Sequence, residues 1–162
     1  MNIVTKNNWE LSSSGLAAGT IYFTLDDGFC FPYENNSDFP IVCIETWIDN
    51  LTLFLKKWVE KQQGKRKKEF AVEMCFFDGP YSYRLVYMNK TSISIIFYRY
   101  DDKLKEIVIN LLEFCSLIVQ KGISLIIIAE SFNIGTEQIR KSLKYLNEMI
   151  RYIFSHSDGS LC

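Results

Sequence analysis

The middle of the chain is the part whose structure the sequence constrains most, because runs of strand-forming residues alternate there with tight-turn signals. Four such runs are present, at residues 70–77, 81–88, 91–100 and 105–109. Asp78-Gly79-Pro80 separates the first two, and Asp101-Asp102-Lys103 precedes the last. Connections this short join antiparallel neighbours, so we expect an antiparallel meander.

Apolar residues at helical spacing predict three helices around this meander. The predicted helices run from about Ile41 to Gln62, from Asn110 to about Ser131, and from Thr136 to Ser155. Asn110, followed three residues later by Glu113, is a capping-box signature. The helix that Asn110 opens is apolar nearly all round, so we expect it to be the most buried of the three.

The first part of the chain is typical of short strands and turns. A weak strand is expected at Trp9–Ser12, and a hairpin from about Thr20 to Pro32, with Asp26 and Asp27 at its tip. The apolar face of an antiparallel sheet must be covered, and three helices can cover it. We therefore expect a two-layer α+β fold, in which an antiparallel sheet of about five to seven strands packs against three helices.

The length of 162 residues suits one domain with one core, and no linker or repeat divides the sequence. We expect residues 1–162 to form that domain, with a frayed tail after about Ser155. Nothing in Met1–Lys6 resembles a secretion signal, and the most apolar stretch, Leu111–Ala129, contains two charged side chains. We therefore expect a cytoplasmic protein without membrane contact.

Charged residues are distributed unevenly along the chain, although the formal net charge is only −1. From Asn7 to Leu55 there are seven acidic residues and no Lys or Arg. From Lys56 to Lys68 there are seven basic residues and one acidic residue. An exposed acidic surface favours a basic partner, because long-range attraction steers the encounter.

The residue types that catalysis needs are scarce or poorly placed. The only histidine, His156, lies in a polar tail where no rigid frame would hold a catalytic geometry. Asp26 with Asp27, or Asp78 with another acid across the sheet, could act as paired carboxylates, but Asp-Asp-Gly and Asp-Gly-Pro are turn sequences in their own right. Five widely spaced cysteines without a Cys-x-x-Cys pair suit reduced core thiols. We expect no catalysis, no cofactor and no metal site.

Two functions other than binding a basic protein stay open on the sequence. The run Lys65-Arg66-Lys67-Lys68 could attract phosphate, which would suit a small regulatory or nucleic-acid-associated domain. Neither a reading helix nor a set of stacking aromatic residues accompanies this run, and short charge runs are usually solvated loops, so we expect no nucleic-acid partner. The other function is a hydrolase with two carboxylates that face each other in a deep pocket.

Two motifs carry a resemblance to a known class of proteins. They are Ser37-Asp38-Phe39-Pro40, followed by Trp47, and Phe77-Asp78-Gly79-Pro80-Tyr81-Ser82-Tyr83-Arg84-Leu85. Their pattern resembles immunity proteins of bacterial polymorphic toxin systems, including contact-dependent growth-inhibition systems, and the likeness extends over about Tyr33 to Gln120. The Lys-rich connector and the helix from Thr136 to Ser155 depart from the pattern.

This resemblance implies a non-enzymatic, cytoplasmic protein that binds the C-terminal domain of its own toxin, often a nuclease. Such a protein blocks the active site or substrate groove of the toxin. A site that holds phosphate is basic, so acidic side chains would pair with it, and tyrosines would supply large, rigid contact area.

We therefore expect the toxin contact to include acidic residues and tyrosines near turns. The candidate contact residues are Asp26, Asp27, Tyr33, Glu34, Asp38, Asp78, Tyr81 and Tyr83. The competing interpretation is that the acids only cap turns and the tyrosines only pack the sheet.

Overall fold

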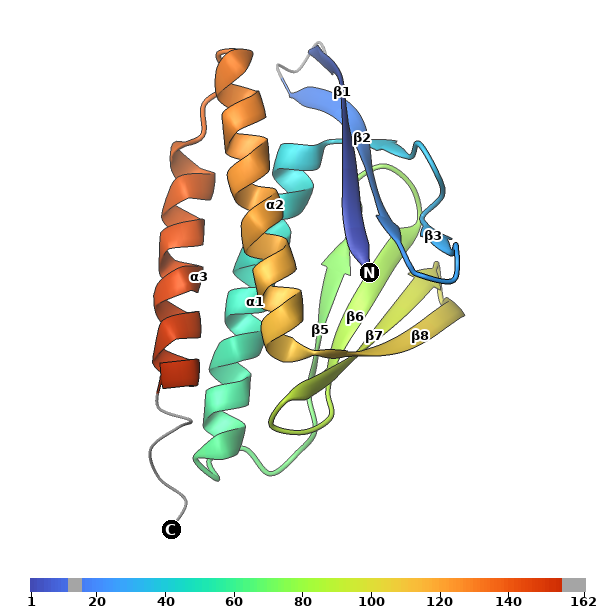
Figure 1. Cartoon of the computed structure of the whole chain (residues 1–162). Coiled ribbons are helices and arrows are strands. Elements are labelled where there is room, and N and C mark those ends of the chain that lie inside the picture. Colours follow the sequence, from blue (N-terminus) through green and yellow to red (C-terminus); the bar gives the residue numbers. More distant parts are fainter. Residues whose placement is uncertain (12–15, 156–162) are drawn as a thin grey trace.

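Two antiparallel sheets lie beside a layer of three helices in the computed structural model, which describes residues 1–11 and 16–155 (Figure 1). The elements follow one another in the order β1 (Asn2–Leu11), β2 (Ala17–Thr24), β3 (Cys30–Phe31), β4 (Ser37–Asp38), α1 (Pro40–Gln62), β5 (Ala71–Cys75), β6 (Tyr81–Tyr87), β7 (Ser92–Arg99), β8 (Asp102–Asn110), α2 (Leu111–Ser131) and α3 (Glu137–Ser155). The expected α+β class with three helices is confirmed.

The meander expected in the middle of the chain is present as the four-stranded sheet β5-β6-β7-β8. Tyr83 of β6 is paired with Phe97 of β7, and both side chains are buried. The next residue, Arg84, is exposed, as the two-residue period of a strand requires. β8 begins at Asp102, earlier than expected, because Tyr100 adopts a left-handed conformation at φ 53° and closes the turn there.

Strands β1 to β4 form a second four-stranded sheet, whereas the sequence suggested a single one. The expected hairpin is present as β2 and β3, while β1 is far longer than the weak strand expected at Trp9–Ser12, of which Ser12 lies outside the described residues. The sheets meet through aromatic side chains, with the ring centroids of Phe23 and Phe31 5.7 and 4.8 Å from that of Phe97. Two separate sheets can bury apolar side chains between them, which one continuous sheet would leave for the helices alone to cover.

Helix α1 is the central helix of the layer. It packs against α2 and α3 and also against β5 and β2, so it contacts both sheets (Figure 1). Pro40 occupies its first turn, where a missing backbone N–H costs nothing. The expectation that α2 is the most buried helix is wrong, because α2 packs with one face and leaves Ile123 and Ile127 49% and 66% exposed.

Among the described residues, α2 is the one helix long and apolar enough to cross a membrane by length and composition. A core helix of a soluble protein passes the same test. Here Phe114, Ile118 and Leu125 are buried against the rest of the fold. The predicted cap is confirmed, because the Asn110 side chain accepts hydrogen bonds from the N–H groups of Leu112 and Glu113 at 2.9 and 3.2 Å.

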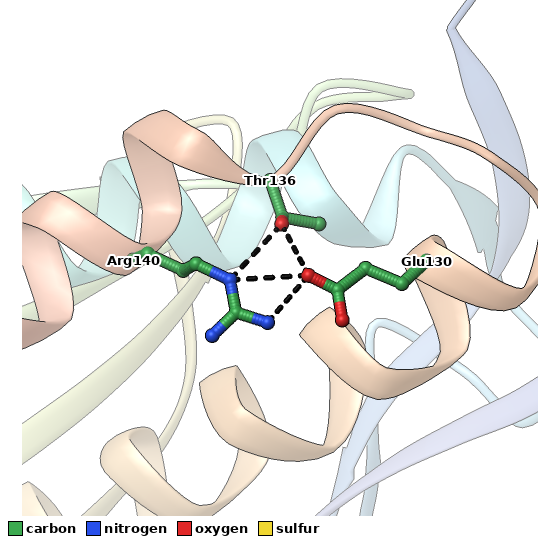
Figure 2. Close-up of polar contacts among 3 residues, drawn as sticks. All are labelled: Glu130, Thr136 and Arg140. Atoms are coloured by element: carbon green, nitrogen blue, oxygen red, sulfur yellow. Dashed lines mark hydrogen bonds and ion pairs between the residues drawn. The ribbon is translucent and has the colours of Figure 1, made fainter.

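The connection between α2 and α3 is held by a three-residue polar network (Figure 2). The Thr136 hydroxyl donates to Glu130 Oε1 at 2.9 Å and accepts from Arg140 Nε at 3.3 Å. Arg140 Nε also donates to Glu130 Oε1 at 3.1 Å, and a second guanidinium nitrogen pairs with the same carboxylate. The end of α2 is thereby joined to the first turn of α3.

An aromatic cluster fills the region where α1 meets the two sheets. The ring of Trp47 stacks on Phe23 at 5.3 Å between centroids and meets Phe76 and Tyr83 edge to face at 5.1 and 5.3 Å. Trp47 Nε1 donates to the carbonyl of Cys75 at 2.8 Å. This cluster gives rigid support to the end of β5 and to the turn that follows it.

Candidate protein-binding surface

The structure divides the expected contact residues into three groups, two exposed to some degree and one buried. The groups are Tyr33, Glu34, Asp78 and Tyr81; Asp26 and Asp27; and Asp38 and Tyr83. Asp38 and Tyr83 are 1% and 0% exposed, so neither can meet a partner in this conformation.

Asp38 is a structural residue, which corrects its inclusion in the expected contact. Its carboxylate accepts hydrogen bonds from the backbone N–H groups of Phe39 at 2.7 Å and Phe77 at 2.9 Å. Burial raises the pKa of the Asp38 carboxyl, and these hydrogen bonds oppose the rise. The side chain therefore ties β4 to the connection between β5 and β6.

Tyr83 is also enclosed, and its inclusion in the expected contact is corrected for the same reason. Its ring lies 5.0 Å from Phe23 between centroids, and its hydroxyl has no hydrogen-bond partner within the described part of the chain. Burial, with Cys43 and Cys75 nearby, raises the pKa of the phenol, so it stays protonated. The face of β6 that carries Tyr83 and Leu85 is the face that packs into the interior.

An exposed aromatic group lies at the turn between β5 and β6. Tyr33 and Tyr81 meet edge to face with ring centroids 6.0 Å apart, and Tyr33 is 51% exposed. Tyr100 is held beside the same turn, because its backbone N–H donates to the carbonyl of Pro80 at 2.7 Å. We call the following six residues the aromatic–acidic surface: Tyr33, Glu34, Phe77, Asp78, Tyr81 and Tyr100.

Phe77 and Tyr100 belong to this surface but were not expected from the sequence. Both leave much of their side chain in solvent, with 49% and 73% exposed. Each directly flanks a turn that contains aspartate, and this position is a signal that the sequence does carry. Aromatic residues that remain exposed on a rigid frame are typical of interface centres.

Asp26 and Asp27 form the tip of the β2–β3 hairpin, as expected, and this tip faces β8. Asp27 accepts from the N–H of Phe29 at 3.1 Å and forms an ion pair with Lys105 of β8. The hydrogen bond from Lys105, followed by that from Phe29, lowers the pKa of Asp27. Asp26 Oδ1 lies 3.2 Å from the amino group of Met1, and the Asp26 side chain is 98% exposed.

Part of the charge asymmetry of the sequence lies on α1, which carries two of the seven acidic residues and three of the seven basic ones. Its first half carries Glu45 and Asp49, and its second half carries Lys56, Lys57 and Lys61. At a rise of about 1.5 Å per residue, Asp49 and Lys56 lie about 10 Å apart along this 23-residue helix, and Glu45 and Lys61 about 24 Å apart. No acidic residue lies in the first turn of α1 and Lys61 lies in its last turn, so Lys61 alone is placed to complement the helix dipole.

The basic connector after α1 folds back on that helix. Arg66 donates to Glu60 Oε2 from two guanidinium nitrogens at 3.0 and 2.8 Å, and Lys61 Nζ donates to the carbonyl of Lys67 at 2.8 Å. Residues 65–68, together with Glu60, line an open cavity of about 420 Å³. Two of the cations in this region are therefore already engaged within the chain.

The thiols of Cys43 and Cys115 are buried and not activated. Burial raises the pKa of the Cys115 thiol to about 12, and burial with the neighbouring Asp38 raises that of Cys43, so both thiols stay protonated and non-nucleophilic. No group of three His, Cys, Asp or Glu residues that could hold a metal occurs within residues 1–11 and 16–155. His156 and the tail after Ser155 lie outside the described residues.

Comparisons with protein-family models, with curated proteins and with solved structures found no match to this chain.

Proposed function

We propose that this chain is an immunity protein, which binds the C-terminal domain of a cognate bacterial toxin and covers the toxin's active site or substrate groove. The observation that carries the proposal is the exposed ring of Tyr33, which packs edge to face on half-buried Tyr81 beside the acidic residues Glu34 and Asp78. Aromatic anchors next to acidic groups suit a basic protein surface, such as that of a nuclease. The resemblance of the motifs around Asp38 and Asp78 to immunity proteins points the same way.

Rigid support beneath the aromatic–acidic surface favours binding. Tyr81 packs edge to face on buried Phe31 at 5.8 Å between centroids. The Asp38 carboxylate fixes the backbone of Phe77 by accepting its N–H. A surface ordered before the encounter loses less conformational entropy when a partner binds. The proposed mechanism is therefore steric and electrostatic occlusion by a preformed surface, in which the chain transforms no substrate.

Co-expression with a panel of toxin nuclease domains in a bacterial host tests the proposal. The expected result is restored growth with at least one domain, together with co-purification of that domain. A double variant, Tyr33→Ala with Phe77→Ala, is expected to lose protection, whereas Tyr145→Ala, at a tyrosine 45% exposed on α3, keeps it. Cleavage of nucleic acid by the purified chain alone would contradict the proposal.

A second candidate function is favoured by one observation, the open cavity of about 420 Å³ bordered by the basic connector 65–68. A nucleic-acid-associated domain would use these cations against phosphate. Its test is the binding of a labelled RNA or DNA duplex by the purified chain. Affinity that falls steeply with salt, and that Lys65→Ala with Lys68→Ala removes, would support this candidate over the first.

A further inference from the structure

Strand β8 forms one edge of the meander sheet. Within residues 1–11 and 16–155 it is paired with β7 alone. On an edge strand, alternate backbone N–H and C=O groups point away from the neighbouring strand. Such groups bond either to water or to another extended chain.

The two halves of β8 differ in how strongly their side chains oppose pairing with an additional strand. The first half carries four charged residues, among them the ion pair of Lys103 and Glu106. The second half, Ile107-Val108-Ile109, carries none, and Val108 is 60% exposed. Charged side chains are the usual protection of an edge strand, so the second half is the unprotected part.

A groove of about 410 Å³ follows this unprotected half. It is bordered by Lys105 and residues 107–110 of β8, by Leu25, Asp26 and Asp27 of the hairpin turn, by Met1 and by Glu113 of α2. Ile107 and Ile109 are half-buried and line the groove on the β8 side. A strand laid beside β8 would direct every second side chain into this groove.

The charges on the groove determine which strand it suits. Asp26, Asp27 and Glu113 are acidic, and the one basic side chain, Lys105, is already paired with Asp27. The contact of Asp26 with the amino group of Met1 involves a side chain that is 98% exposed, and such contacts are weak. An incoming lysine or arginine can therefore pair with Asp26 or Glu113.

The geometry points to β8 as a docking strand for an extended, basic segment of a partner protein, in which lysine or arginine alternates with apolar residues. The segment extends the meander sheet by pairing with Ile107–Asn110, and its basic side chains contact Asp26 and Glu113. This site includes none of the six residues of the aromatic–acidic surface, but it shares Asp26 and Asp27 with the contact residues expected from the sequence.

A synthetic peptide tests this assignment on the full chain. The probe is a fluorescein-labelled nonapeptide, Lys-Val-Lys-Ile-Lys-Val-Lys-Ile-Lys, and binding is measured by fluorescence anisotropy at low salt. One control peptide has both valines replaced by proline at the same charge, and the other has glutamate in place of every lysine. We expect the proline peptide to bind at least about tenfold more weakly, because proline cannot donate to a strand ladder. We expect no binding of the glutamate peptide.

Variants of the chain locate the site. Val108→Lys places a like charge on the open edge and is expected to weaken binding of the lysine peptide by about tenfold. The matched control, Ile127→Lys, makes the same change at a position 66% exposed on α2 and leaves binding unchanged. Circular dichroism checks that both variants fold. Hydrogen exchange at residues 107–110 is expected to slow when the lysine peptide is bound.

Three outcomes would overturn the assignment. Equal binding of the lysine and proline peptides would mean that charge alone attracts them. No binding of the lysine peptide at millimolar concentration would show that β8 is not a docking strand for basic segments. A dimer in sedimentation velocity that Val108→Lys dissociates would mean that the edge is occupied by a second copy of this chain.

Discussion

The carboxylate of Asp38 joins two parts of the chain 39 residues apart, because its Oδ2 accepts the backbone N–H of Phe77 at 2.9 Å. Its other oxygen accepts the N–H of Phe39 at 2.7 Å. The turn that carries the aromatic–acidic surface is thus fastened to β4 by a side chain that is itself 1% exposed. A residue expected from its sequence motif to lie in the contact is instead buried and positions Phe77 at the start of the turn.

Replacing Asp38 with asparagine should destabilise the fold. The amide offers one acceptor oxygen where the carboxylate offers two, so one of the two partly buried N–H groups, of Phe39 or Phe77, loses its partner. We expect the free energy of unfolding to fall by about 1–3 kcal/mol in urea denaturation. Glu34→Gln, at an exposed position, should change it by less than about 0.5 kcal/mol. Equal effects of the two changes would show that Asp38 does not hold the turn.

The free energy of unfolding of the wild type and that of Asp38→Asn should depend differently on pH. Burial raises the pKa of Asp38 above 3.8, so the folded state holds this proton more tightly than the unfolded chain does. The contribution of Asp38 to stability is therefore greatest below pH 3.8 and declines as the pH rises through the raised, folded-state pKa. The stability of the wild type minus that of Asp38→Asn should fall across that interval in urea titrations. A difference that grows with pH would contradict the sign.

Gly122 allows α2 and α3 to approach closely. A β-carbon at this position would lie 3.0 Å from Leu143 Cδ2, which is closer than van der Waals contact. Gly122→Ala should therefore destabilise the fold by about 1–3 kcal/mol through overpacking, despite a gain of about 1 kcal/mol in helix propensity. In a double-mutant cycle followed by thermal unfolding, Leu143→Ala should cost less in the Gly122→Ala background than in the wild type. Additive effects would mean that the two side chains do not clash.

Tyr33 should matter for binding and little for folding. Its ring contacts Tyr81 but is 51% exposed, so Tyr33→Ala should lower stability by less than about 1 kcal/mol. If the proposed toxin contact is correct, the same change should weaken binding to the toxin domain that the chain neutralises in the co-expression test. We expect a loss of about 2 kcal/mol, or roughly thirtyfold in Kd, as measured by calorimetry. Unchanged affinity would exclude Tyr33 from the contact.

The hairpin tip supplies a kinetic test of electrostatic steering. Exchanging Asp26 and Asp27 for asparagine removes two negative charges from an exposed turn. If this tip faces the toxin, the association rate at low salt should fall several-fold and should depend less on salt. Stopped-flow fluorescence measures both quantities. An association rate that does not change at any salt concentration would place the tip outside the contact.

Local signals in the sequence predicted part of the candidate surface. Asp78-Gly79-Pro80 forms the expected turn, with Gly79 at φ 98°, a conformation that glycine adopts without strain. A turn places its own side chains in solvent, so Asp78 is exposed as expected. The same reasoning failed for Asp38 and Tyr83, because their burial depends on which other elements cover them.

By itself, the sequence determined the strands of the meander and the three helices, but not the extent of β1. Apolar residues recur with a period of two in these strands and of about 3.6 in these helices, and turn residues and the Asn110 cap mark where elements end or begin. These signals act over a few residues, so the sequence carries them directly. Only the tertiary structure decided that the strands form two sheets, that α1 rather than α2 is central, and that Tyr33 meets Tyr81. Those outcomes depend on how apolar faces far apart in the chain bury one another, and burial is a property of the assembled fold.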